Sequence, residues 1–178
     1  QKPYTNGTDE YYEDLHDRFA RGEAWDADSI RFADSLKYTT EGGKTVYGGG
    51  GIMPDLFIPI DTTGGSVYFN RVANRGLIYR FALKFSDDSR PTLSELSKWE
   101  EFDEFLEKED IFAQFTRYAS SQGVKPDPQG IRRSGDVINT QLKAYIARNF
   151  IDNDGFYPIW LNLDTTLKKA ISFLMEEE

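Results

Sequence analysis

The chain has 178 residues, no cysteine and a formal net charge of −9 at pH 7. Without cysteine it holds no disulfide, no thiolate metal site and no cysteine nucleophile. Its negative charge disfavours binding to nucleic acid and to anionic membrane surfaces, because like charges repel. Aromatic residues make up 15% of the sequence, so large side chains are available to build a buried core.

The N-terminal segment is acidic and predicts helices. Residues 9–22 place apolar side chains three to four positions apart, crowd acidic residues into the first turn and end at Gly22. This is the pattern of an amphipathic helix with a glycine stop. Asp26 or Asp28 is suited to cap a second, short helix that continues through Phe32.

Residues 36–60 change to a strand-like composition. Residues 36–40 and 45–47 favour two short strands, and the glycine-containing residues 41–44 favour the turn between them. Residues 56–60 form an apolar run bounded by prolines, which predicts a third, buried strand. We therefore expect a small β segment that contains a glycine-rich hairpin.

After residue 66 apolar side chains recur at helical spacing to the end of the chain. The first helix is expected to span residues 66–85, with Gly76 inside it at a close contact between helices. Capping boxes are expected in residues 91–95 and 97–100. Gly123 and the Asn153-Asp154-Gly155 run are expected to end later helices.

Four further apolar stripes predict the remaining helices and their core faces. Their members are Trp99, Phe102, Phe105 and Leu106; Ile111, Phe115 and Tyr118; Ile138, Leu142, Tyr145, Ile146 and Phe150; and Trp160, Leu163, Leu167, Ala170, Ile171 and Leu174. The predicted fold is mainly α, with a small β segment followed by an aromatic-rich helical bundle. The expected domains are residues 1–61 and 62–178.

A run of four glycines is the most unusual local feature. Tyr47 is followed by Gly48, Gly49, Gly50 and Gly51, and then by Ile52, Met53, Pro54 and Asp55. Glycines are costly to order, so such a run indicates positive φ angles or close backbone packing. A phosphate-binding loop is disfavoured, because no lysine follows the glycines. We interpret the run as a structural ribbon, with Pro54 and Asp55 fixing the turn that follows it.

Residues 47–55 resemble the "gGGI-x-PD" segment of the C-terminal processing peptidases (tail-specific proteases), which are serine peptidases that use a Ser–Lys pair. Residues 1–4 resemble the stretch that follows the last core strand, after the catalytic Lys, in the Bacteroidetes branch of this family. The resemblance is thin over residues 66–178. Residues 5–44 are an acidic insert that simpler members of the family lack.

In that family both catalytic residues precede the matching segment. The resemblance therefore implies that the chain is the end of a protease core followed by a helical domain, and that the chain itself is inactive. It assigns no catalytic residue, metal ligand or cofactor to this chain. It assigns a structural role to the glycine-rich motif, Gly48, Gly49, Gly50, Gly51, Pro54 and Asp55.

The resemblance also implies the setting of the full-length protein. The parent would be an exported protease of the periplasm or cell envelope that cleaves polypeptides near their C-termini. The implied partners are its own protease core, its PDZ domain and the polypeptide substrates. The helices would brace the core, shape access to the site or mediate contacts in a homo-oligomer, and no nucleic acid is expected to bind.

Other candidate sites in the sequence have simpler interpretations. His16 is the only histidine and lies among acidic residues, which favours a solvated helix surface. The carboxylates of residues 100–110 occupy the solvent side of an amphipathic helix. Residues 152–155 lack the downstream glutamate of an EF-hand loop. No serine has the local setting of an activated nucleophile.

Two hypotheses of other classes remain beside the peptidase. The chain could be a stand-alone acidic helical module that binds or scaffolds other proteins, with a glycine run that matches the family by chance. A hydrolase that acts through carboxylates has only the acidic composition in its favour, because residue spacing along one helix cannot establish a catalytic pair across a cleft.

Overall fold

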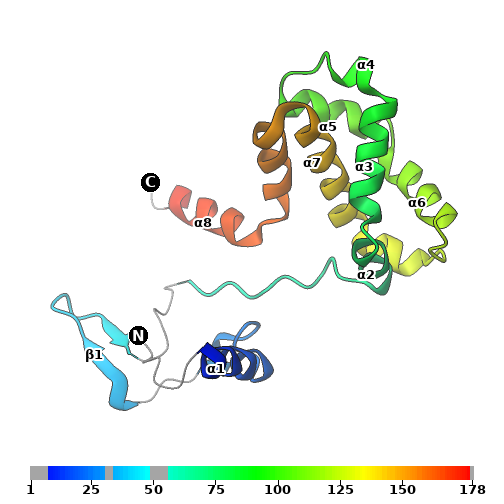
Figure 1. The fold of residues 1–178 in the computed structure, drawn as a ribbon. Helices are drawn as coiled ribbons and strands as arrows, with labels where there is room; N and C mark the ends of the chain where they lie inside the picture. The colour runs from blue at the N-terminus through cyan, green and yellow to red at the C-terminus, as the bar shows by residue number, and fades with distance from the viewer. Residues whose placement is uncertain (1–7, 31–33, 49–55, 177–178) are drawn as a thin grey trace. The chain divides into compact units, whose positions relative to one another are not determined.

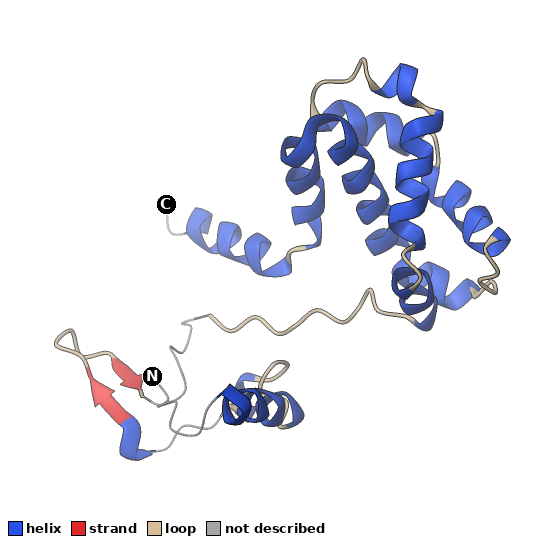
Figure 2. Ribbon diagram, viewed as in Figure 1, coloured by secondary structure: helices blue, strands red, loops and turns tan. Residues whose placement is uncertain are grey.

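The computed structural model describes residues 8–30, 34–48 and 56–176. The chain divides into two compact units, residues 1–60 and 61–178. The described residues are mainly helical, with one small antiparallel sheet (Figures 1 and 2). The predicted fold class, mainly α with a small β segment and an aromatic-rich helical part, is confirmed.

The first unit begins with helix α1, Thr8–Ala20. The backbone leaves the helix at Gly22, which has a φ of 87° and so takes the left-handed conformation that glycine tolerates best. Of the two caps expected, Asp26 is used: its carboxylate accepts a hydrogen bond from the Asp28 N–H at 3.0 Å and begins the short 3₁₀ helix Ala27–Ser29.

A two-stranded hairpin follows in the first unit. The 3₁₀ turn Asp34–Leu36 leads into β1, Lys37–Thr39, which pairs antiparallel with β2, Thr45–Tyr47. The predicted hairpin is therefore confirmed. Both strands are largely exposed to solvent within their own unit.

The prediction of a third strand at residues 56–60 is wrong. This segment has no strand structure, and its Ile60 N–H donates a single backbone hydrogen bond to the Ala24 carbonyl at 3.0 Å. Pro59 carries no N–H for a ladder, and the described sheet contains only β1 and β2. An apolar run without a neighbouring strand has no partner for its backbone groups and remains irregular.

The second unit is a bundle organised around one long helix. Its elements are α2 (Val67–Asn74), α3 (Leu77–Asp88), α4 (Arg90–Leu93), α5 (Trp99–Lys108), α6 (Ile111–Ser121), α7 (Pro128–Trp160), the 3₁₀ turn Leu161–Leu163 and α8 (Thr165–Glu176). Helix α7 packs against α2, α3, α5 and α6 (Figure 1). The largest fully buried side chains include Tyr68, Phe102, Phe115, Ile138 and Leu142.

The expectation of one helix over residues 66–85 is wrong, because Gly76 separates α2 from α3. Gly76 has a φ of 64°, in the left-handed region, and an added Cβ there would meet no atom within 4 Å. The glycine is therefore required by a turn of the backbone and not by close packing between helices. Periodicity continues across the turn because both helices face the same core.

The end of α7 also differs from the expectation. Its helical geometry breaks at Ile151 and Asp152, where Asp152 has a φ of 50° and a ψ of −133°. The first arm of the helix therefore ends just before residues 153–155, and these residues begin a second helical arm. Gly155 is buried there, and a Cβ on it would lie 2.9 Å from the backbone of Ala147. The missing side chain lets the second arm pack against the first.

The two predicted capping boxes are not formed as expected. The carboxylate of Glu101, not Glu100, accepts hydrogen bonds from the N–H groups of Ser97 and Lys98 at 2.8 and 3.1 Å. These bonds lower the pKa of Glu101. In residues 91–95 the residue that would have to cap a helix, Thr92, lies inside α4 and begins no helix.

Candidate functional site

The glycine-rich motif lies mostly outside the described residues. Of its members only Gly48 is described, while Gly49, Gly50, Gly51, Pro54 and Asp55 are not. The Gly48 N–H donates to the Leu36 carbonyl at 2.8 Å, so the hairpin's hydrogen bonding reaches the first glycine. A Cβ on Gly48 would lie 3.3 Å from the Tyr38 ring, which is tight. The structural role of the whole run stays a prediction.

The histidine and the carboxylates discussed above form no metal site among the described residues. His16 is exposed on α1, and Asp154 is exposed on the second arm of α7. Within residues 8–30, 34–48 and 56–176, no three side chains of His, Cys, Asp or Glu are placed to hold a metal ion together. Asp152 lies at the kink of α7, where its backbone is not helical.

The serines with shielded hydroxyls serve the fold. Ser66 caps α2 by accepting the Phe69 N–H at 3.0 Å, and it accepts a second hydrogen bond from the Ser134 hydroxyl at 2.6 Å. Ser86, which is fully buried, accepts from the Asn149 side-chain amide at 2.9 Å. These hydroxyls contact backbone, hydroxyl and amide groups, whereas an activated serine needs an adjacent base.

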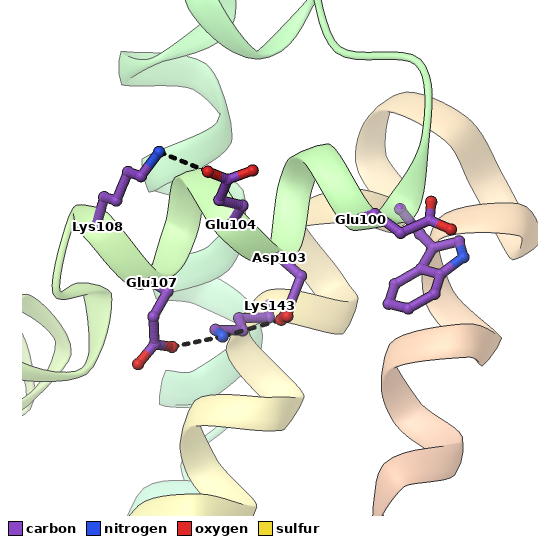
Figure 3. Close-up of a pocket in the computed structure, with 7 residues that line it drawn as sticks. Glu100, Asp103, Glu104, Glu107, Lys108 and Lys143 are labelled. Carbon is purple, nitrogen blue, oxygen red and sulfur yellow. Dashed lines mark hydrogen bonds and ion pairs between the residues drawn. The ribbon is translucent and has the colours of Figure 1, made fainter.

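A shallow groove lies between α5 and α7 in the second unit. Its volume is about 460 Å³. Figure 3 shows the side chains that line it. The lining residues are Trp99, Glu100, Asp103, Glu104, Glu107, Lys108 and Lys143. All but Lys143 come from α5, whose acidic side chains face outward because Phe102 and Leu106 face the core.

Lys143 is the one group in the groove that sequence reasoning missed. Its side chain is only 10% exposed, and its Nζ lies 2.9 Å from an Asp103 oxygen and 2.6 Å from a Glu107 oxygen (Figure 3). Burial disfavours the charged ammonium, but the hydrogen bonds to Glu107 and Asp103 outweigh this and raise the pKa of Lys143. A lysine between Leu142 and Ala144 in an apolar stripe was the available signal.

The chemistry of the groove is that of a structural ion-pair cluster. Glu104 and Lys108 form a second pair, at 2.7 Å and four residues apart on α5. The lining side chains contain no hydroxyl, thiol or imidazole, so they supply no nucleophile of these types. The arrangement joins α5 to α7 and presents excess negative charge beside the Trp99 ring.

A second notable surface is the apolar face of α8. None of its described side chains is buried, although the helix carries Ile171, Phe173, Leu174 and Met175 at exposures of 46–73%. The start of α8 is fixed: Asp164 accepts the Leu167 N–H at 2.8 Å. Of the stripe predicted over residues 160–174, Trp160 belongs to α7 and packs against the core, whereas the members in α8 are not buried. Figure 1 shows α8 leading away from the other helices of the unit.

Comparison with known proteins finds a family model that matches part of the chain. Residues 68–152 match the model of a family of unknown function, DUF8443. The match runs from Tyr68 in α2 to Asp152 at the kink of α7, so it lies within the helical unit. No curated protein and no solved structure matches the chain. Among the described helices, none is long and apolar enough to cross a membrane.

Proposed function

We propose that the chain is the non-catalytic C-terminal region of a C-terminal processing serine peptidase, whose Ser–Lys pair lies outside this sequence. Residues 61–178 would then be an accessory helical domain that braces the catalytic core. The proposal begins from the resemblance of residues 47–55 to the family's glycine-rich segment. It assigns to this chain a supporting role and not the chemistry.

The observation that carries the proposal is that no apolar side chain is buried among the described residues of the first unit. Among its described residues the only buried side chain is that of Glu23, held by Arg18 at 2.7 Å and Arg21 at 2.9 Å. Burial opposes ionisation, but these arginines outweigh it and lower the pKa of Glu23. One ion-pair cluster does not replace a hydrophobic core, which is the main source of stability in a fold.

The apolar side chains of the hairpin are not buried either. Tyr38 and Val46 are directly paired across β1 and β2, which places their side chains on one face of the sheet. They remain 57% and 38% exposed. An isolated two-stranded hairpin is at best marginally stable in water. Additional strands or a packed face from a larger core would supply what this unit lacks.

In this proposal the location, partners and substrates of the parent protein follow from the resemblance to the peptidase family. The parent would be an exported enzyme of the periplasm or cell envelope, with a PDZ domain that holds the substrate tail. Its substrates would be polypeptides cleaved near their C-termini. The apolar face of α8 would offer contact area to the core or to a second copy of the protein.

Peptidase assays test the first half of the proposal. The purified chain is expected to hydrolyse neither casein nor an unfolded peptide with an apolar C-terminal tail, because its partly shielded serines serve caps and interhelical hydrogen bonds. Turnover by the chain alone, with phosphonate labelling of one of its serines, would overturn the proposal.

Fragment complementation tests the second half. A Ser–Lys tail-specific peptidase core that ends before the region matching residue 1 is expected to bind this chain and to gain activity. Replacing both Tyr38 and Val46 by lysine should abolish binding, because it charges the uncovered face. The matched control replaces Thr39 and Thr45, which are paired and lie on the opposite face, by lysine and should bind normally. Equal loss of binding in both variants would argue against the proposed face.

A stand-alone acidic binding module is the second candidate, and one observation favours it. The buried apolar side chains of the described chain all lie between Tyr68 and Ile159, so the helical unit has a core of its own. We expect residues 61–178 alone to keep a cooperative thermal transition and high helicity by circular dichroism. The two candidates differ in whether residues 1–60 are needed to bind the partner.

A further inference from the structure

The segment that leads into the helical unit is held on α7 by side chains. Residues 61–66, here called the strap, contain two consecutive glycines and would ordinarily be expected to form a flexible linker. Instead, Arg133 of α7 donates from Nε to the Thr63 carbonyl at 3.0 Å and from Nη2 to the Thr62 carbonyl at 3.4 Å. An arginine with two donors thus grips two successive backbone carbonyls.

Close packing adds a second point of attachment. A Cβ on Gly64 would collide with the Val137 side chain of α7, so the glycine backbone lies directly against that residue. The Ser134 hydroxyl reaches Ser66 at the end of the strap. Arg133, Ser134 and Val137 lie within five consecutive residues of one helix, so a single stretch of α7 holds the whole strap.

The strap also has internal order. The Asp61 carboxylate accepts the Thr63 N–H at 2.8 Å and the Thr63 hydroxyl at 2.6 Å, and these bonds lower the pKa of Asp61. The Gly65 N–H donates to the Thr62 carbonyl at 3.2 Å. The segment is therefore a compact turn with hydrogen bonds of its own.

Nothing in the strap belongs to the hydrophobic core. Residues 61–66 are exposed or half-buried, and the first buried side chain among the described residues of the second unit is that of Tyr68 in α2. Regions with few buried apolar contacts and solvent-exposed hydrogen bonds open at a lower free energy than the whole fold. The Ser66 cap on Phe69 marks where such an opening stops, because α2 is anchored from there.

We propose that the strap is a latch, which Arg133 and Val137 hold on α7 and which releases while the helical core stays folded. In the held state residues 61–66 lie on α7, and in the released state they are free of it. The role of the latch in controlling attachment of the helical domain to a peptidase core rests on the proposed function. The latch itself does not depend on that assignment.

Hydrogen–deuterium exchange of the full chain tests the latch. In the wild-type protein, the Thr63 and Gly65 amides are expected to exchange more slowly than free peptide. Replacing Arg133 by alanine removes two hydrogen bonds and should speed exchange of the strap by about tenfold, without changing peptides from α3 or α7. The matched control is Arg132→Ala, an exposed neighbour on α7, which should leave the strap unchanged.

A pair of packing variants tests the same latch by another route. Gly64→Ala should also free the strap, because its methyl group collides with Val137, and the double variant Gly64→Ala with Val137→Ala should restore slow exchange. The proposal is overturned if the wild-type strap exchanges as free peptide, or if Arg133→Ala and Gly64→Ala leave it protected. It is also overturned if both variants speed exchange throughout α3 and α7. None of these results would alter the outcome of the peptidase and complementation assays.

Discussion

Replacing Gly155 by alanine tests the account of the α7 kink, which sequence reasoning missed. The added Cβ would lie 2.7 Å from the Ile151 side chain and 2.9 Å from the backbone of Ala147. Overpacking of this kind costs about 1–3 kcal/mol, and the gain from replacing a helical glycine offsets up to about 1 kcal/mol of it. We therefore expect Gly155→Ala to lower the free energy of unfolding by about 1–2 kcal/mol.

Gly135 provides the matched control on the same helix. A Cβ there would lie 3.4 Å from the Phe112 ring, which is an ordinary contact, so Gly135→Ala should stabilise the protein by about 0.5–1 kcal/mol. The two variants should then differ by about 2 kcal/mol, or roughly 8 °C in melting temperature for a unit of this size. Thermal unfolding followed by circular dichroism measures the difference. A Gly155→Ala protein that melts at or above the wild type would refute the packing account.

Three further variants probe other features of the helical unit. Asp152→Gly should stabilise the helical unit by about 1 kcal/mol in urea unfolding. Glycine relieves the backbone strain at a φ of 50°, and this gain exceeds the extra conformational entropy that glycine loses on folding; a destabilised variant would contradict this. The pKa of Lys143 is raised in the folded state, so its ion pairs contribute fully below the unfolded pKa of about 10.4 and are lost as the pH rises through the folded value. Between pH 8 and pH 12 the free energy of unfolding of the wild type should therefore fall by up to about 1 kcal/mol more than that of Lys143→Met. The difference is small because Asp103 and Glu107 are partly exposed, so solvent screens the ion pairs; parallel pH profiles of the two proteins would argue against it. The pKa of Glu101 is lowered, so its cap is present above the unfolded pKa and is lost as the pH falls; Glu101→Gln should flatten the acid limb of a stability profile, and an unchanged limb would contradict this.

Local signals in the sequence predicted most helices and the hairpin. The α6 stripe, its stop at Gly123 and the turn at residues 41–44 depend on periodicity and turn chemistry, which act over a few residues. The same reasoning failed at Gly76, because two helices that face one core keep a common apolar period across a turn. It failed at residues 56–60 because a strand needs a partner that a local pattern does not reveal.

The groove and the strap were less predictable. The acidic residues of α5 were placed correctly on its solvent side, yet the pairing of Asp103 with Lys143 joins residues 40 positions apart. Arg133 and Thr63 are 70 positions apart, and a glycine-rich segment suggested only a boundary. Contacts of this kind depend on how helices pack, and spacing along the sequence does not encode them directly.

The gene sequence that precedes Gln1 tests the central claim most directly. The account predicts an open reading frame that continues upstream and encodes a peptidase core with a Ser–Lys pair and a PDZ domain. The unit formed by residues 1–60 would then complete a sheet in that core. A start codon close to Gln1, with no such core before it, would contradict the account and leave the acidic helical binding module as the better description.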